Sequence, residues 1–215
     1  MARPRPGGVS TKQRLLDTAT AEFAARGFDG AKVDRIAARA KVNKAMLYYH
    51  FQSKAGLYLA ILREQFGALG EAAASARIPG LAADAQVRRF IEAMAREALA
   101  RPAFPAIWLR EISEGGRHLD ATVVMALRRV LETLVAILAD GQRAGVFRPV
   151  NPLVVQISIV APLMFFAASA PFRARVGRLL PAPVPPPELS DMIAHVQAAT
   201  LAVLAAPAPS RRRKR

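Results

Sequence analysis

Apolar residues recur at helical spacing along most of this chain, and no segment shows the strict alternation of a half-buried β-strand. Residues three or four positions apart share one face of an α-helix, so such a stripe predicts a helix that buries that face. The first stripe consists of Leu15, Leu16, Ala19 and Phe23. Ser10 or Thr11 can cap this helix, and Gly27 can end it. The pattern predicts an all-α fold.

Glycine, proline and capping residues divide the rest of the chain into further helices. Two short helices come first, over residues 33–40 and 44–50, with a tight connection between them. Asn151 before Pro152 marks the start of a later helix, because proline is favoured in the first helical turn. The longer predicted helices span residues 54–76, 84–100, 106–113, 119–142, 152–170 and 188–205, and a proline-rich linker occupies residues 181–187.

The composition is that of a globular protein. Of the 215 residues, 53% are hydrophobic and 22% are charged, which is enough apolar material for a sizeable core. Cysteine is absent, which excludes disulfides, thiolate metal sites and cysteine nucleophiles. The chain has three histidines and no G-x-S-x-G, H-E-x-x-H, P-loop or Rossmann motif. We therefore expect neither an enzyme nor a cofactor or metal site.

The net charge of +15 is concentrated at the two ends of the sequence. Residues 1–63 carry +8, residues 64–210 carry only +2, and the run 211–215 carries +5. A positive field of this kind attracts polyanions and speeds their encounter with the protein. The charge alone is compatible with nucleic-acid binding, with an acidic membrane surface, or with solubility only. No apolar run follows the basic N-terminus, so we expect no secretory signal and a cytoplasmic location.

No charged residue occurs between Arg148 and Arg173, a stretch long enough to suggest a membrane-spanning helix. Gln156, Ser158 and Pro162 interrupt it, and a helix that is apolar all round is equally suited to a core or an oligomer interface. We favour the core or interface and expect no membrane partner. The alternative is a membrane-associated or amphipathic interaction protein that uses this stretch and the basic tail.

The two short helices have the features of a helix-turn-helix, in which the second helix enters the major groove and the first crosses the DNA backbone. Small residues that allow the helices to approach are Ala37, Ala38 and Ala40. The apolar residues that fix the angle between them are Ile36, Val42, Leu47 and Phe51. The groove-facing candidates on the second helix are Lys44, Tyr48, Tyr49 and His50, with groups that can bond phosphates and bases. Lys54 can meet a phosphate together with the N-terminal amides of the next helix.

At these residues the sequence resembles the tetracycline-repressor (TetR) family of bacterial transcriptional regulators. The resemblance covers about residues 11–62, whereas residues 64–205 match only in outline. Its most specific part is the run Leu47-Tyr48-Tyr49-His50-Phe51-Gln52-Ser53-Lys54. The supporting positions are Ile36-Ala37, Ala40-Lys41-Val42, Ala21, Phe23 and Gly27.

The resemblance implies roles for individual residues. Tyr48 and Lys54 match positions that hold phosphates. The positions that meet the groove are matched by Asn43, Lys44, Ala45, Met46, Tyr49 and His50. Two departures add Lys41 and Lys32 as DNA-contact candidates: Lys41 stands where the family usually has a turn glycine, and Ala31-Lys32 replaces the usual Thr or Ser. A strained non-glycine turn residue and a lost helix-cap oxygen each cost about 1 kcal/mol.

The predicted organisation has four parts. They are a flexible basic arm (1–9), a helix-turn-helix domain (10–53, the head), a ligand-binding and dimerisation domain (54–205, the body) and a disordered basic tail (206–215). Arg3 and Arg5 in the arm can enter a minor groove or contact phosphates nonspecifically. For the tail, nonspecific attraction is the favoured role.

The resemblance also implies a homodimer formed by the last two helices, because two-fold dimers read palindromic sites. The candidate interface or core residues are Leu153, Ile157, Val160, Met164, Met192, Val196 and Leu201. A mostly apolar ligand pocket is expected in the body. Its candidate residues are Phe90, Met94, Phe104, Trp108, His118, Met125, Phe165 and Phe166, each of which is equally suited to core packing, or, for His118, to an exposed loop. If they point into the pocket, the carboxylates of Glu97, Glu111 and Glu114 would suit a cationic ligand.

Together these features predict a ligand-responsive repressor that binds palindromic operator DNA as a dimer. We expect an apolar or amphipathic small molecule to release it by changing the spacing of the two recognition helices. A DNA-binding regulator without a ligand, and an activator, would have the same head.

Overall fold

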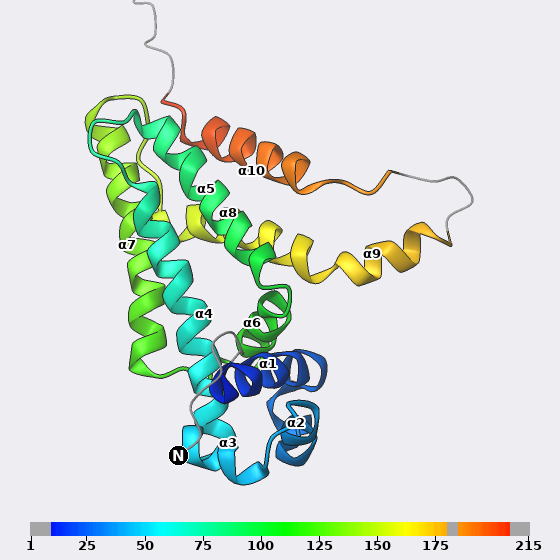
Figure 1. Ribbon diagram of the computed structural model, residues 1–215. Coiled ribbons are helices and arrows are strands. Elements are labelled where there is room, and N and C mark those ends of the chain that lie inside the picture. Colours follow the sequence, from blue (N-terminus) through cyan, green and yellow to red (C-terminus); the bar gives the residue numbers. More distant parts are fainter. Residues whose placement is uncertain (1–9, 180–184, 207–215) are drawn as a thin grey trace, which may run out of the picture. The chain divides into compact units, whose positions relative to one another are not determined.

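The computed structural model describes residues 10–179 and 185–206, and every regular element in these two ranges is a helix (Figure 1). The all-α prediction is therefore confirmed. The predicted arm, the first part of the proline-rich linker, and residues 207–215 of the tail lie outside the described residues. An isolated β-bridge joins Phe147 to Ala205.

The head contains the three predicted helices: α1 (Thr11–Gly30), α2 (Val33–Arg39) and α3 (Lys44–Phe51). Ser10 caps α1, since its hydroxyl accepts a hydrogen bond from the Gln13 amide at 3.1 Å. Gly27 has a φ of 71° and breaks the helical geometry of α1, as predicted, although one further turn continues to Gly30. Left-handed backbone of this kind favours glycine because it has no Cβ.

The remaining helices lie close to their predicted ranges, with one exception. They are α4 (Lys54–Ala76), α5 (Ala83–Ala100), α6 (Phe104–Ser113), α7 (Ala121–Arg143), α8 (Pro152–Ala168), α9 (Ala170–Gly177) and α10 (Leu189–Leu204). Helix α9 was not predicted. The chain turns by 56° between α8 and α9, where the Ser169 hydroxyl donates to the Phe165 carbonyl and Pro171 lacks an amide proton.

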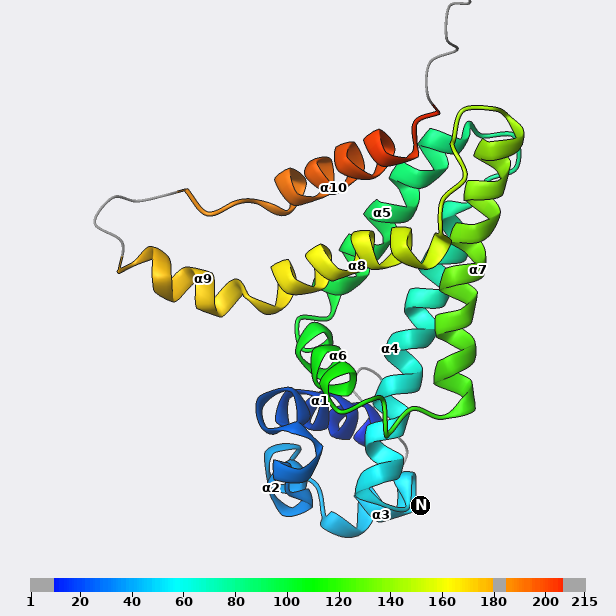
Figure 2. The same cartoon turned by 180° about the vertical axis from the view of Figure 1, so that it is seen from behind.

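Packing divides the chain into two compact units. The first contains the head, the N-terminal part of α4, and residues 101–124, which include α6. There α1 contacts α2, α3 and α6 (Figure 2). Its largest fully buried side chains are Leu15, Phe23, Ile36, Leu47, Leu57, Ile61, Leu62, Phe66 and Phe104. The second unit contains residues 68–100 and 125–206 among those described, and α5, α8 and α10 contact one another in it.

The uncharged stretch forms α8, which is followed by the bend into α9. Within the described residues, no single helix combines the length and apolar composition needed to cross a membrane. Helices α8 and α9 taken together are long and apolar enough, but they are bent against each other.

Two glycines in α4 have opposite surroundings within the first unit. A Cβ on Gly56 would lie 2.1 Å from the carbonyl oxygen of Phe51, whereas a Cβ on Gly67 would meet nothing within 4 Å. The space at Gly56 is taken by backbone, because α3 ends directly before α4 and the Ser53 hydroxyl accepts from the Gly56 amide at 2.9 Å. The absence of a side chain at Gly56 is therefore what allows this tight junction.

We expect Gly56→Ala to destabilise the protein by more than about 1 kcal/mol, because backbone must move to admit the methyl group. Gly67→Ala is the matched control in the same helix, and it should raise the free energy of unfolding by roughly 0.5–1 kcal/mol by removing glycine's excess chain entropy. Urea unfolding followed by circular dichroism measures both. Equal effects of the two substitutions would contradict the proposed role of Gly56.

Candidate nucleic-acid interface

Helices α2 and α3 pack largely as the sequence pattern predicted, but Ala38, expected among the small residues between them, is exposed, and Val42 is only half-buried. Ile36, Ala37 and Ala40 are buried on the α2 side, and Leu47 and Phe51 are buried on the α3 side. The small alanines allow close approach, while the larger apolar side chains fill the space between α1, α2 and α3. This packing leaves the opposite face of α3 exposed.

The turn between α2 and α3 has the left-handed backbone expected where the TetR family usually has a glycine. Lys41 has a φ of 53°, in a region that costs a non-glycine residue on the order of 1 kcal/mol or more. The Lys41 amide donates to the Ala38 carbonyl and the Val42 amide to the Ala37 carbonyl, both at 3.1 Å. The strained turn is therefore present, and it holds the Lys41 side chain in an exposed position beside α3.

The two helices of the motif begin differently. Asn43 caps α3, because its Oδ1 accepts a hydrogen bond from the Ala45 amide at 2.8 Å. Lys32 precedes α2 without any side-chain cap, as its replacement of the usual hydroxyl residue predicted. Only Oδ1 of Asn43 takes part in the cap. The side-chain NH₂ group of Asn43 can therefore donate hydrogen bonds to an acceptor on a base or phosphate.

The exposed face of α3 carries most of the predicted DNA-contact residues. Tyr49 is the most exposed of them, with 78% of its surface accessible, and Tyr48 is also exposed. Asn43, Lys44 and Ala45 are exposed at the start of the helix. The predicted residues that are only partly exposed are Met46, His50 and Lys54.

His50 is less available than its predicted role requires. Its Nε2 is buried and has no hydrogen-bond partner, and its ring lies 5.1 Å from that of Tyr49 and 6.1 Å from that of Phe51, between centroids. A side chain in this position supports the orientation of Tyr49.

Two of the predicted DNA-contact lysines, Lys54 and Lys44, are engaged within the protein. Lys54 Nζ donates to the Asp29 carbonyl at 3.3 Å and lies 4.7 Å from the centre of the Phe28 ring. Lys44 Nζ lies 2.7 Å from Asp34 Oδ1, and this hydrogen bond raises the pKa of Lys44. Lys41 and Lys32 are exposed.

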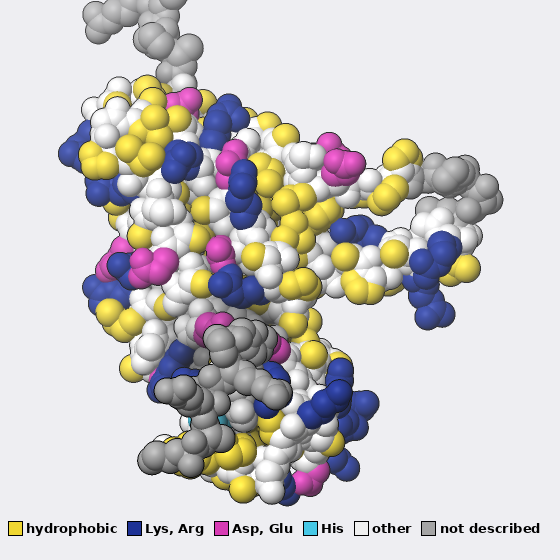
Figure 3. Space-filling view, in the orientation of Figure 1, with side chains coloured by type: hydrophobic (Ala, Val, Ile, Leu, Met, Phe, Trp, Pro, Cys, Tyr) yellow, Lys and Arg dark blue, Asp and Glu magenta, His cyan; other side chains and the backbone are white. Residues whose placement is uncertain are grey.

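A buried carboxylate in the head was not singled out by the sequence. Glu22 on α1 is only 1% exposed and lies 2.7 Å from the guanidinium of Arg35. Arg26 and Arg39 approach the same carboxylate at 3.4 and 3.6 Å. One negative charge thus fixes α2 against α1 and leaves a net positive side chain cluster at the surface (Figure 3). Glu22 falls within the apolar stripe of α1, which is the signal that would have found it.

A second buried polar cluster joins α4 to α6 in the first unit. The Tyr58 hydroxyl donates to Glu111 Oε1 at 2.7 Å, and His118 Nδ1 lies 2.8 Å from the same oxygen. Burial raises the pKa of Tyr58, and the hydrogen bond to Glu111 raises it further, so the phenol stays protonated. His118 is therefore packed against a carboxylate and is no exposed loop residue.

The predicted ligand-binding residues divide between the two units. Phe104, Trp108 and His118 belong to the first, and the Phe66 ring packs edge-on against those of Phe104 and Trp108. The second unit holds Phe90, Met94 and Phe166, which are buried, and Met125 and Phe165, which are exposed.

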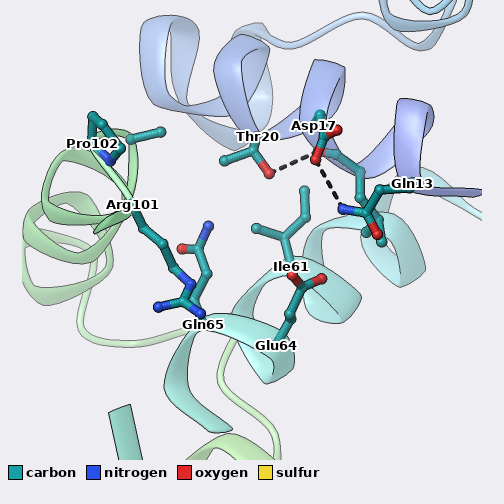
Figure 4. A pocket seen from close by; sticks show the side chains of 10 residues that line it. Gln13, Asp17, Thr20, Ile61, Glu64, Gln65, Arg101 and Pro102 are labelled. Atoms are coloured by element: carbon teal, nitrogen blue, oxygen red, sulfur yellow. Dashed lines mark hydrogen bonds between the residues drawn. The ribbon is translucent and has the colours of Figure 1, made fainter. Parts of the chain in front are cut away.

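A cavity in the first unit is lined by other residues. It measures about 240 Å³ and lies between α1, α4 and the segment before α6 (Figure 4). Gln13 and Asp17 from α1 face Glu64 and Gln65 from α4, with Arg101 at its side. The lining also includes Leu16, Ile61, Pro102 and Ala103, so polar and apolar side chains share the wall.

The predicted dimerisation residues differ in their exposure to solvent. Leu153 and Ile157 on α8 are exposed, at 53% and 57%. Met164 and Val196 are buried within the second unit, so they belong to its core. Those that are half-buried are Val160, Met192 and Leu201. An apolar groove of about 320 Å³ runs between α8 and α10, lined among others by Val154, Pro162 and Val203.

Comparison with known proteins agrees with this geometry. The family model described as bacterial regulatory proteins of the tetR family matches residues 15–61, and the one described as the tetracyclin repressor-like C-terminal domain matches residues 84–193. The chain is 26% identical to the HTH-type transcriptional repressor NicS of Pseudomonas putida, over 73% of this chain and 74% of that protein. It is 27% identical to the HTH-type transcriptional regulator RutR of Escherichia coli, over 78% and 79%.

The fold is also that of solved regulators. A crystal structure of a tetR-family regulatory protein from Rhodococcus RHA1 superposes with a TM-score of 0.76, covers 94% of this chain and all of its own, and is 19% identical. Proteins of this family are regulators and not enzymes. The two family models together match both the helix-turn-helix and most of the body, so the chain belongs to the TetR family of transcriptional regulators.

Proposed function

We propose that the protein is a ligand-responsive repressor that binds palindromic operator DNA as a homodimer and is released by an apolar or amphipathic small molecule. The observation that carries the proposal is α3, which buries Leu47 and Phe51 on one face and exposes Tyr48 and Tyr49 on the other. The Tyr49 side chain is 78% exposed, so most of its ring is available to a partner.

In this proposal, sequence is read by α3 and position is fixed by the basic residues around it. Tyr49 and the Asn43 amide face the base edges, where hydroxyl and amide groups discriminate between base pairs. Tyr48, Lys41 and Lys32 contact phosphates, which fix register without reading sequence. Lys44 and Lys54 join them after leaving Asp34 and Asp29. The similarity to NicS, a transcriptional repressor, supports repression.

The proposed homodimer forms through α8 and α10. Leu153 and Ile157 are exposed apolar residues on a helix whose other face is buried in the second unit. Such surface is costly to leave in water, and a two-fold interface would cover it. Dimerisation places two α3 helices roughly 34–36 Å apart, one turn of DNA. A ligand that favours another separation therefore lowers operator affinity.

The family assignment favours this regulator over the membrane-associated alternative. The proposed partners are operator DNA, a small-molecule effector and a second copy of the chain. The proposed location is the cytoplasm, where the DNA is accessible.

The first test is binding of the full-length protein to the DNA immediately upstream of its own gene. We expect a footprint over a palindrome and a loss of roughly 1–3 kcal/mol, or about 5- to 150-fold, in affinity for Tyr49→Ala. Phe172→Ala is the matched control, because Phe172 is an aromatic residue of α9 with similar exposure, 67%. Sequence-independent binding that Tyr49→Ala leaves unchanged would contradict the proposal.

Lys41 allows charge and backbone strain to be separated. Lys41→Gly relieves the left-handed backbone and should raise the free energy of unfolding by up to about 1 kcal/mol, whereas Lys41→Ala keeps the strain and should give no such gain. Both remove one positive charge and should lower the salt dependence of DNA binding by about one counterion. Chemical unfolding and affinity measured against salt concentration supply the two readouts. A salt dependence unchanged in both variants would remove Lys41 from the interface.

The dimer is tested at Ile157. Ile157→Glu places a charge on the exposed face of α8 and should shift the protein to monomers in analytical ultracentrifugation, because a carboxylate is costly to bury in an apolar interface. Met125→Glu is the control, since Met125 is an equally exposed residue of α7. If the protein is monomeric without any substitution, or if both variants behave alike, α8 does not form the interface.

A further inference from the structure

The end of α6 and the turn that follows it bring two carboxylates and an imidazole together. Glu111 lies in the last turn of α6, Glu114 is the C-cap residue directly after the helix, and His118 follows the turn. One potential ligand atom from each of these three residues lies within 4.8 Å of the others. All three residues belong to the first unit.

The Glu111 carboxylate is incompletely satisfied. It is 1% exposed, and its Oε1 takes both contacts, from the Tyr58 hydroxyl at 2.7 Å and His118 Nδ1 at 2.8 Å. Its Oε2 is buried and has no hydrogen-bond partner. A buried carboxylate oxygen without a partner carries the full cost of its lost hydration. A cation beside Oε2 would remove that cost.

The turn holds the imidazole in place. Gly115 and Gly116 both have a φ of 72°, and the Gly116 amide donates to the Glu111 carbonyl at 2.7 Å, which brings the chain back towards α6. The His118 ring lies 4.3 Å from the Phe28 ring and 5.2 Å from the Tyr58 ring, between centroids. These packed rings reduce the side-chain entropy that ligation would otherwise cost.

Arg117 forms an ion pair with Glu114, the more exposed of the two carboxylates. Its guanidinium lies 2.9 Å from Glu114 Oε2 and 2.8 Å from Asp29 Oδ2, and this arginine lowers the pKa of Asp29. The Arg117 side chain is half exposed, so it can leave Glu114 and keep Asp29 as its partner. Glu114 is thereby able to exchange an arginine for a metal ion without losing a compensating charge.

We propose that Glu111, Glu114 and His118 form a binding site for a divalent transition-metal ion of the Zn²⁺ class. The ligand set consists of one nitrogen and two carboxylate oxygens, which suits Zn²⁺, Co²⁺ or Mn²⁺ better than Mg²⁺ or Ca²⁺, since the latter prefer oxygen alone. Three protein ligands leave further positions to water.

Calorimetric titration of the full chain with ZnCl₂ in a non-coordinating buffer tests the site without any DNA. The absence of cysteine removes thiolate binding as a competing source of heat. We expect one ion per chain, bound at least roughly tenfold more weakly by Glu114→Gln and by His118→Asn. Both side chains lie at the rim of the cluster, so the fold should survive, and circular dichroism verifies this.

Two control variants locate the ion. His195→Asn removes an exposed histidine of α10, and Glu92→Gln removes an exposed carboxylate of α5, and neither should change the affinity. Titration with CoCl₂ adds a spectroscopic readout: a visible absorption band that His118→Asn abolishes identifies imidazole as a ligand. The absence of Zn²⁺ binding, binding that persists in Glu114→Gln and His118→Asn, or binding lost in His195→Asn would overturn the proposal.

Discussion

The buried carboxylate of Glu111 is the constraint around which the first unit is arranged. A charge this deeply buried requires partners, and the nearest are Tyr58 from α4 and His118 from the segment after α6. The rings of Phe23 and Phe28 pack on Tyr58 from α1. The single polar contact between Tyr58 and Glu111 therefore holds α4 and α6 in register, and the aromatic rings extend that register to the first helix of the head.

In the head, too, charged side chains are paired, and most of these pairs lie nearer the surface than Glu111. Glu22 gathers three arginines from α1 and α2, Asp34 holds Lys44, and the Asp29 carbonyl holds Lys54. These pairs disperse the repulsion among basic residues that would otherwise oppose folding of a compact, strongly positive domain. The pair of Lys44 with Asp34 is exposed and Lys54 is partly exposed, so a phosphate can take the place of Asp34 or of the Asp29 carbonyl at little cost. The arrangement reconciles a stable free head with an affinity for polyanions.

The second unit explains why one helix lacks both charge and amphipathic character. Met164 and Ile159 of α8 face the core, while Leu153, Ile157 and Phe165 are exposed. A helix that is apolar on both sides needs two apolar neighbours. The chain supplies one, in α5 and α10, and the proposed second copy supplies the other. The same composition suggested a membrane span in the sequence, because hydropathy alone does not distinguish lipid from protein as the surrounding medium.

The sequence by itself determined the helical class, nearly all helix boundaries and the helix-turn-helix, because these follow from local periodicity, capping residues and turn chemistry. The resemblance to the TetR family, rather than local pattern, pointed to the strained turn at Lys41 and the missing cap at Lys32, as departures from the family's usual residues. Helix α9 escaped prediction because the break at Ser169 lies within the stretch between Arg148 and Arg173, where no charged residue marks a boundary. Only the tertiary structure decided which members of that run are buried and which are exposed, that Lys54 is held by Asp29 and Phe28, and that Glu111 and His118 meet. These outcomes depend on contacts between residues as far apart as 53 positions, such as Tyr58 and Glu111, and local pattern carries no information about such pairs.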